Sequence, residues 1–471
     1  MKSEHPPPQV PEAKHDDFRA CESLASNRPA TKIPDEVLAR AWQTDPCVSD
    51  LHSIDSVVSH FFATIESTPI LRFLPEERPR AWLAGGNNRK SLDDLMLLYS
   101  ILAIGMVLSG GPKHIASEYA QVAHYAQRNS HIPSLQLVQS RILLALYYRT
   151  TLSMSNFEEM ISASTVAAIA LRLDTELDDS KTDEFTEFPL GMSRIGYCEA
   201  RRRTLWSLFM LERLGGSYSA RPTMICSKDI YIRLPADLRS FDQQAEAETP
   251  LFEPSQTGRS PTPGEHLSIG AYLVEIVKIW ADCQKAVGRS SRRRSYADMW
   301  ATKQRGLMGK LEEWHASLPP RLLESAHNFE SADVSGSLGA LLTMHCLYRH
   351  SMIVLGRTVA ARTVLSPESG ARQVRQCNEH ALSILDIFNH LDTILRRHTL
   401  ELKALPPILA TVVTEAVEIL FTDVAGVSDS VSDKVRNLQH VLTSLGNVWD
   451  DWHIAKPSIE QRVYKMKRAR E

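Results

Sequence analysis

The sequence has 471 residues, of which 43% are hydrophobic and 23% are charged. This apolar fraction excludes an intrinsically disordered chain, and the length excludes a small disulfide-stapled fold. The 53 Lys and Arg residues are nearly balanced by 56 Asp and Glu residues, giving a net charge of −3. A protein that attracts nucleic acid over its whole surface would be basic, so any contact with DNA is expected to be local or indirect.

The cysteines do not form a metal-binding pattern. No two of them lie within five residues of each other, so the sequence contains no C-x-x-C half-site for zinc. They are Cys21, Cys47, Cys198, Cys226, Cys283, Cys346 and Cys377. An odd number of widely spaced cysteines is typical of free thiols in a reducing compartment. We therefore expect no bound metal and no cofactor.

The sequence also has no pattern that predicts a secretion signal or a membrane span. The N-terminal residues lack the apolar segment of a secretion signal. The longest apolar run, Leu95–Leu108, has 14 residues, whereas a membrane-spanning helix needs about 18–20. We expect this run to be a buried helix of a soluble intracellular protein that has no membrane partner.

The first half of the chain begins with a polar segment and continues with helical patterns. Residues 1–35 are rich in Pro, Ser and charge, and are predicted to be disordered. From residue 48 to residue 235, apolar residues recur at three- and four-residue spacing, which predicts helices. Clear apolar helix faces occur at residues 51–65, 137–148 and 161–173. The polar stretch over residues 174–187 interrupts this pattern and is predicted to be a surface loop.

The helix predicted from Cys198 to Leu214 is the most distinctive, because its first turns carry three consecutive arginines. The helix dipole disfavours positive charge at that end, and Glu199, four residues before Arg203, offsets part of the penalty. We predict that the arginines pair with internal acids and determine packing, with a phosphate contact as the alternative. After this helix, Ser227 is the predicted N-cap of a short turn.

The second half of the chain is also predicted to be helical. Residues 236–266 contain four prolines and many acids, which predicts a flexible loop or linker. Helical periodicity then returns over residues 267–455. The expected helices lie near residues 267–287, 307–318, 336–362, 366–395, 405–424 and 432–452. The predicted fold class is therefore all-α, as one large multi-helical body.

No motif predicts catalysis. The sequence contains no G-x-S-x-G, no H-E-x-x-H and no phosphate-binding loop of the G-x-x-x-x-G-K-[ST] type. His345 and His350 are five residues apart, a spacing that does not place them on one helix face for metal binding. We predict that the protein is not an enzyme.

Two short basic clusters are candidates for nuclear import signals or phosphate contacts. They are Arg292, Arg293 and Arg294 between two predicted helices, and Lys465, Lys467, Arg468 and Arg470 in a basic C-terminal tail over residues 456–471. Neither cluster has the interleaved aromatic residues of a single-strand nucleic-acid binder. The alternative for both is a segment that only keeps the protein soluble.

One segment, EARRRTLWSLFMLERLGGSYSARPTMICSKDIYIRLP at Glu199–Pro235, resembles the central signature of the fungal-specific transcription factor regulatory domain. This domain is the middle homology region of zinc-cluster transcription factors. The signature joins a basic run, a helix with T-x-W-S-x-F-x-x-[DE]-R, a [G/A]-R-P, a D-I and an L-P. It falls on Arg201, Arg202, Arg203, Thr204, Trp206, Ser207, Phe209, Glu212, Arg213, Arg221, Pro222, Asp229, Ile230, Leu234 and Pro235. Flanking segments agree in order, so the resemblance covers about residues 48–452.

The resemblance implies a regulatory body that acts in the nucleus on a specific gene set, such as a biosynthetic gene cluster. The implied partners are other transcription regulators or coactivators, a second copy in a homodimer, and a small-molecule effector. In this family a six-cysteine zinc cluster that reads the major groove usually precedes the body. Only Cys21 and Cys47 precede residue 48 here, so this sequence does not encode such a reader. We therefore expect DNA to be reached indirectly, or through a region absent from this chain.

Three explanations for the missing reader stay open: a natural family member that acts without one, an absent first exon, or a gene model trimmed upstream. An alternative function is a helical protein that senses a small molecule, or an adaptor that modulates other transcription factors. In either case, Arg213 and Arg221 are predicted to place their guanidinium groups against a buried acid or backbone carbonyls. Replacing Arg221 with alanine should then lower the melting temperature.

Overall fold

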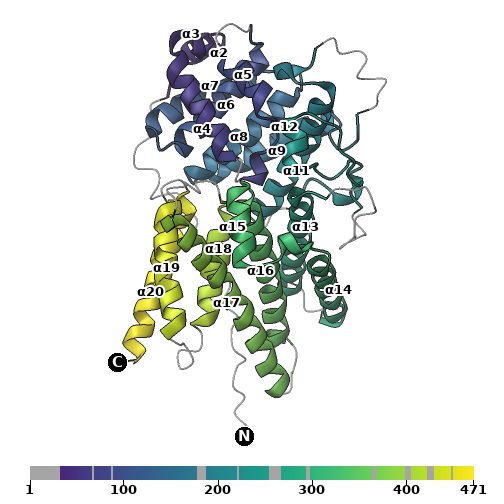
Figure 1. The fold of residues 1–471 in the computed structure, drawn as a ribbon, viewed down its shortest axis with the longest axis vertical. Coiled ribbons are helices and arrows are strands. Elements are labelled where there is room, and N and C mark those ends of the chain that lie inside the picture. Colours follow the sequence, from purple (N-terminus) through teal and green to yellow (C-terminus); the bar gives the residue numbers. More distant parts are fainter. Residues whose placement is uncertain are drawn as a thin grey trace.

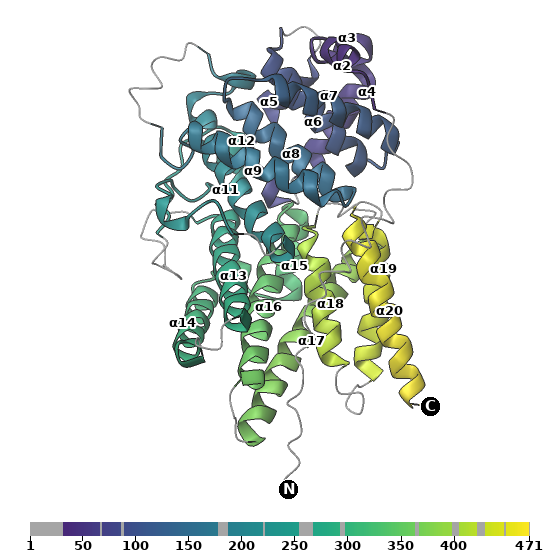
Figure 2. The same ribbon diagram turned by 180° about the vertical axis from the view of Figure 1, so that it is seen from behind.

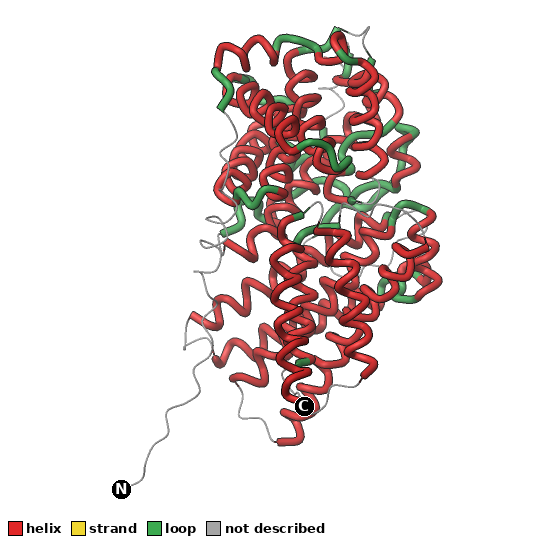
Figure 3. The backbone as a smooth tube through the Cα atoms, turned by 90° about the vertical axis from the view of Figure 1, so that its left-hand side faces the viewer, coloured by secondary structure: helices red, strands yellow, loops and turns green. Residues whose placement is uncertain are grey.

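The structure, a computed structural model, confirms the all-α fold. Figure 3 shows helices joined by loops, and no strand is present among the described residues, which form only the isolated bridges Thr175–Tyr231 and Arg233–Leu251. The described residues are 32–65, 68–85, 89–177, 187–219, 222–253, 267–292, 297–362, 367–397, 405–421, 429–446 and 449–470. Most of the segment predicted to be disordered, residues 1–31, lies outside this description.

The first half of the chain folds into the upper part of the molecule in Figure 1, where α6 packs on α4, α7 and α8, and α8 packs on α9. Its α-helices are α2 (Asp35–Trp42), α3 (Pro46–Ser49), α4 (Leu51–Ile65), α5 (Glu77–Ala84), α6 (Leu92–Leu108), α7 (Lys113–Asn129), α8 (Leu135–Thr150), α9 (Met154–Ala170), α11 (Arg194–Ser219) and α12 (Leu238–Asp242). The short 3-10 turns are η1 (Pro69–Leu71), η2 (Pro189–Gly191) and η3 (Ser227–Asp229).

The second half forms the lower part of the molecule, where long helices lie roughly along its long axis (Figures 1 and 2). These are α13 (Ile269–Arg292), α14 (Ala297–Ala316), α15 (Ala326–Val334), α16 (Leu338–Arg362), α17 (Pro367–Arg397), α18 (Ile408–Leu420), α19 (Asp429–Gly446) and α20 (Asp450–Arg470), with the 3-10 turn η5 (Pro320–Leu322). Helix α16 packs against α13 and α17, and α17 packs against α18 and α19.

The start of α6 shows how the sequence defines a helix end. Ser91 accepts a hydrogen bond from the backbone N–H of Asp94 at 3.1 Å, and the Asp94 carboxylate accepts one from the backbone N–H of Ser91 at 3.0 Å. This reciprocal capping box satisfies two N–H groups that the helix leaves without partners. The same carboxylate accepts from Trp82 at 3.3 Å and Gln136 at 3.2 Å, so the cap also joins α6 to α5 and α8.

The most apolar helices are core helices. The predicted apolar run, Leu95–Leu108, lies within α6 and is almost entirely buried. A second stretch, Leu338–Arg357 in α16, is long and apolar enough to cross a membrane by length and composition, but 83% of its most apolar window is buried inside the protein. Such burial explains the composition without a membrane, because a helix that is apolar on all sides is typical of a protein interior.

Helix α11 connects the two parts of the molecule. It packs on η1, α8 and α9 of the first half and on α13 of the second half. Most of the buried apolar residues of both halves belong to one continuous core, from Leu38 to Ile459. Helix α11 therefore holds a central position, and the boundaries of the predicted segments at residues 48–235 and 267–455 stay predictions.

The segment predicted to be a flexible loop at residues 236–266 is partly ordered. It contains α12, and Phe241 and Phe252 are only 1% and 6% exposed. The backbone N–H of Phe252 also donates to the carbonyl of Ile232 at 3.0 Å. Burying two aromatic side chains stabilises a segment that lacks helical periodicity. Apart from α12, residues 236–253 form a loop, as predicted, and the predicted flexibility of this segment stays a prediction. Residues 254–266 lie outside the described residues.

The C-terminal prediction also needs correction. The single helix expected over residues 432–452 is two helices, α19 and α20, and the basic tail at 456–471 is helical through Arg470. Helix α20 packs on α18 and α19, and Ile459 within the predicted tail is 0% exposed. Burial of this side chain accounts for a helix that continues through Pro457.

Candidate functional site

The first turns of α11 carry a buried acid, Glu199, that joins an arginine to the loop after the helix. Glu199 Oε1 accepts hydrogen bonds from Arg203 Nε at 2.8 Å and from the backbone N–H of Ala236 at 2.9 Å. Arg203 also donates to the carbonyls of Ala236 at 2.5 Å and Arg72 at 3.2 Å. Its guanidinium lies 4.3 Å from the centre of the Phe241 ring. Burial lowers the pKa of Arg203, although the nearby Glu199 opposes this change.

The other two arginines of the triplet also bind groups of the protein. Arg202 Nε lies 2.9 Å from each carboxylate oxygen of Glu176, and Nη1 lies 3.1 Å from Glu199 Oε2. Arg201 donates to the carbonyl of Leu171 at 3.0 Å, at the end of α9. Arg201 and Arg203 are each 7% exposed. The arginine triplet is therefore directed into the molecule, in contacts that hold α11 to the chain before and after it.

In the middle of α11, Trp206 anchors the closing segment of the motif. Its indole N–H donates to the carbonyl of Arg233 at 2.9 Å. Its ring meets Phe209 and Phe252 edge-to-face, with centroids 5.4 and 5.0 Å apart. Trp206 is 1% exposed and Phe209 is 0% exposed. Aromatic pairs of this geometry stabilise a core beyond the area that they bury.

Near the end of α11, Glu212 and Arg213 hold the following loop. The Glu212 carboxylate accepts hydrogen bonds from the backbone N–H groups of Met224 and Ile225, and lies 3.3 Å from Arg213 Nη1. Arg213 Nη2 donates to the carbonyl of Ile225 at 2.9 Å and to the hydroxyl of Ser227 at 3.2 Å. Burial lowers the pKa of Arg213 to about 10 despite Glu212, so the guanidinium stays charged at neutral pH.

The remaining motif residues divide into buried and exposed groups. Ile230, Leu234 and Pro235 are buried, whereas Pro222 and Asp229 are exposed. The short turn predicted to begin after Ser227 is the 3-10 turn η3, but its N-cap is Cys226, whose side chain makes no cap hydrogen bond. Ser227 instead lies inside the turn, where its hydroxyl accepts from Arg213. This use of the hydroxyl explains why the N-cap prediction was wrong.

Several predicted site residues lie outside the description. The backbone positions of Arg221, Arg293 and Arg294 are not among the described residues. For Arg292, Lys465, Lys467, Arg468 and Arg470 the structure describes a helical backbone but no side chain. The roles predicted for all of these residues stay predictions.

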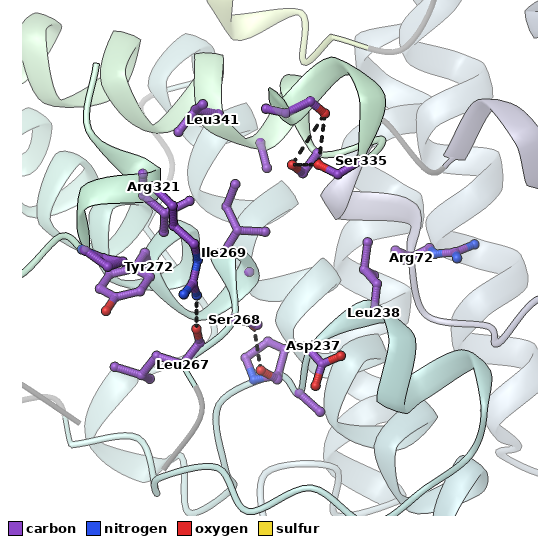
Figure 4. A pocket seen from close by; sticks show the side chains of 18 of the residues that line it. Arg72, Asp237, Leu238, Leu267, Ser268, Ile269, Tyr272, Arg321, Ser335 and Leu341 are labelled. Atoms are coloured by element: carbon purple, nitrogen blue, oxygen red, sulfur yellow. Dashed lines mark hydrogen bonds between the residues drawn. The ribbon is translucent and has the colours of Figure 1, made fainter. Parts of the chain in front are cut away.

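A cavity of about 520 Å³ lies where the two halves of the molecule meet. Arg203, Trp206 and Ser207 of α11 line it from the first half, together with the loop around Asp237. The second half contributes the start of α13, η5, α15 and the start of α16. Figure 4 shows these walls facing one another, with Leu238 on one side and Leu341, Ile269 and Arg321 on others. The motif helix thus forms part of a cavity wall as well as part of the core.

Sequence reasoning missed the polar residues that complete this region. Arg72 forms an ion pair with Asp242 at 2.7 Å across 170 residues of sequence, and no spacing rule predicts such a pair. The signal for Arg72 was its place among apolar residues in PILRFLP, because a charged residue in an apolar run needs a buried partner. Asp237 and Arg321 also lie beside Leu and Pro residues, in LPADLR and LPPRLL, but nothing in these short segments relates either residue to a cavity.

The histidines that were considered as metal ligands have other partners. His345 lies 2.9 Å from the carbonyl of Leu322, and His350 lies between the indole N–H of Trp280 at 2.9 Å and Glu415 at 3.0 Å. Within the described ranges, no group of three or more His, Cys, Asp or Glu residues could hold a metal ion. These contacts fit histidines that are hydrogen-bonded within a helical core.

The fold and the motif define an all-helical body organised around one basic, Trp-containing helix. Residues 61–316, more than half of the chain, match the fungal specific transcription factor domain. The chain therefore belongs to this family of fungal transcription regulators. No solved structure matches the chain.

Curated relatives agree with this assignment. A transcriptional regulatory protein of Schizosaccharomyces pombe is 27% identical over 285 residues, which are 56% of this chain and 29% of that protein. A Zn(2)-C6 fungal-type transcription factor of Fusarium oxysporum f. sp. lycopersici is 23% identical over 265 residues, which are 54% of this chain and 28% of that factor. The chain thus spans less than a third of the length of these relatives.

Proposed function

We propose that this chain regulates transcription of a specific gene set, such as a biosynthetic gene cluster, through its helical body and without catalysis. The observation that supports this proposal most strongly is the family match over residues 61–316. The buried network of α11 also supports the proposal that the helical body is regulatory. The motif residues that the structure describes mainly contact each other and neighbouring loops. Its partners are other transcription regulators or coactivators, or a second copy of the chain.

The proposal includes indirect engagement of DNA. Proteins that bind DNA neutralise phosphates with accessible Lys and Arg side chains. The arginine triplet of α11 instead donates to Leu171, Glu176, Glu199 and Ala236. DNA contact is then left to a partner or to a region outside this sequence, and no zinc-cluster reader is needed within the chain.

Deleting the gene tests this function. We expect a limited set of transcripts to change under conditions that induce the pathway, and reintroducing the wild-type chain should restore them. The measurement is a comparison of transcript profiles for the parent, the deletion strain and the complemented strain. Identical profiles in all three strains, across a range of nutrient conditions, would contradict the proposal.

Substitutions in the two basic clusters test the predicted nuclear localisation. In a fluorescent fusion, replacing Lys465, Lys467, Arg468 and Arg470 together with Arg292, Arg293 and Arg294 by alanine should lower the nuclear-to-cytoplasmic ratio several-fold, because import receptors recognise clustered positive charge. A control variant replaces the scattered, exposed Arg239, Arg305 and Arg372 by alanine, and should stay nuclear. Nuclear signal that is equal in both variants would show that these clusters do not direct import.

A second candidate function, a protein that senses a small molecule and modulates other transcription factors, is favoured by one observation. The cavity between the halves is large enough for a metabolite and is lined by the motif helix. This candidate adds an input to the proposed regulator, since the same body can sense a ligand and contact partners.

A further inference from the structure

The cavity between the two halves has the size and lining of a metabolite site. Its volume of about 520 Å³ lies within the range of roughly 300–1,000 Å³ that is usual for small-molecule sites. Trp206 and Met210 of α11 face it from the first half, and Ile269 and Leu341 line it from the second half. Such a wall favours a ligand with an apolar body, because burying apolar surface supplies most of the binding free energy.

Most charged groups in the wall already have partners. Arg72 pairs with Asp242 at 2.7 Å, and Arg203 pairs with Glu199 at 2.8 Å. The carboxylate of Asp237 caps α12, where it accepts from the backbone N–H of Ser240 at 3.0 Å and from its hydroxyl at 2.7 Å. Arg72 and Arg203 therefore contribute little net charge to a ligand, because each is paired with a carboxylate, whereas Asp237 keeps its negative charge.

Arg321, the middle residue of η5, is different. It lines the cavity and is exposed, and among the described residues no carboxylate forms an ion pair with it. Its Nη2 donates to the carbonyl of Leu267 at 3.3 Å, a contact drawn in Figure 4. Figure 4 also places Asp237 beside Leu238, away from this guanidinium. The wall therefore presents a cation whose four other N–H donors are available to an anionic group.

Ser207 provides a second polar contact. It is 1% exposed and lines the cavity, yet in the described part of the chain its hydroxyl has no hydrogen-bond partner. By contrast, Thr204, one turn earlier, donates to the carbonyl of Ala200 at 2.7 Å. A hydroxyl that lines a cavity can donate to, or accept from, a polar atom of a ligand, so Ser207 offers the ligand one hydrogen-bond partner.

We infer that this cavity binds an apolar carboxylic acid in its carboxylate form. The carboxylate pairs with the guanidinium of Arg321, the apolar body packs against Trp206 and Ile269, and a polar substituent reaches the hydroxyl of Ser207. The inference rests on the proposed function, because such a site is regulatory only in a protein that controls transcription.

The position of the cavity means that a bound ligand would affect how the two halves of the molecule pack together. Because its walls come from both halves of the molecule, a bound acid contacts α11 on one side and α13 or α16 on the other. A ligand that binds only the assembled walls stabilises that assembly in proportion to its concentration relative to Kd. The acid would therefore strengthen the packing between the halves, and this change connects ligand binding to altered partner contacts.

Matched probes test the charge requirement directly. Isothermal titration calorimetry of the full chain would compare 1-naphthaleneacetate with 1-naphthaleneacetamide, and decanoate with decanamide, below the concentrations at which they self-associate. In each pair the body is the same and only the charge of the head group differs. We expect saturable binding of at least one acid, about tenfold tighter than its amide, because a charge-assisted hydrogen bond is stronger than a neutral one.

Three variants locate the site. Arg321→Gln should remove the preference for the acid over the amide. Ser207→Ala should leave that preference while lowering affinity for 3-hydroxydecanoate relative to decanoate. The matched control is Arg239→Gln, which replaces an exposed arginine outside the cavity wall and should bind like wild type. Melting temperatures of all variants without ligand show whether each one is folded.

Two results would overturn the inference: no saturable binding of either acid, or an equal loss of acid affinity in Arg321→Gln and Arg239→Gln. These outcomes are distinct from failure of the proposed function. A chain that binds no acid but whose deletion changes transcripts keeps its function and loses only the effector. A chain that binds the acid through Arg321 but controls no transcripts keeps the site and loses the regulatory role.

Discussion

Replacing Glu212 with alanine is expected to lower the free energy of unfolding by about 3–5 kcal/mol, the usual cost of removing one partner of a buried ion pair. Glu212 is 1% exposed and Arg213 is 5% exposed. The change leaves the Arg213 charge in the interior without its carboxylate. It also removes the acceptor for the backbone N–H of Ile225, which donates at 3.2 Å. Urea denaturation of the purified chain measures the loss.

Two further variants make this test specific. Glu313→Ala changes an exposed glutamate within a helix, so it should shift stability by less than about 0.5 kcal/mol. The double variant Glu212→Leu/Arg213→Leu removes both charges and should recover part of the loss, since no uncompensated charge stays buried. Equal destabilisation by Glu212→Ala and Glu313→Ala would show that the buried pair is not a structural anchor.

Replacing Trp206 with alanine should cost about 3–5 kcal/mol through a different mechanism, the loss of a large buried side chain and the cavity that it leaves. The indole is 1% exposed and contacts Phe209 and Phe252. The change also leaves the carbonyl of Arg233 without the donor that lies 2.9 Å away. Thermal melting and urea denaturation should both show the effect.

The controls for Trp206 separate its ring from its N–H group. Trp206→Phe keeps an aromatic ring but loses the hydrogen bond, so it should cost less than the alanine change. Trp42→Ala removes a tryptophan that is only half-buried, and should also cost less. If Trp42→Ala were as destabilising as Trp206→Ala, the central place of the motif tryptophan in the core would be contradicted.

The sequence predicted the fold class because helical periodicity is a local signal. The apolar faces at residues 51–65 and 137–148 depend on side chains three and four positions apart, and both lie in observed helices. The i, i+4 pair of Glu199 and Arg203 is present for the same reason. The family resemblance rested on a contiguous motif, so it too could be recognised without a structure.

Long-range packing explains what the sequence could not predict. The order of residues 236–253 comes from Phe241 and Phe252, whose burial depends on helices far away in the chain. The cavity joins Ser207 to Arg321 through the meeting of two halves, which no local pattern encodes. Periodicity locates helix faces, but it does not say which faces meet.

The central structural account is that the basic motif holds the body together and makes no contact with DNA. The most direct measurement is the affinity of the purified chain for random-sequence duplex DNA as a function of salt, for wild type and Arg202→Gln. The account predicts the same salt dependence for both proteins, whatever the basic C-terminal helix contributes, and a lower melting temperature for the variant. A salt slope that falls by about one unit in Arg202→Gln would show that Arg202 contacts a phosphate, and would contradict the account.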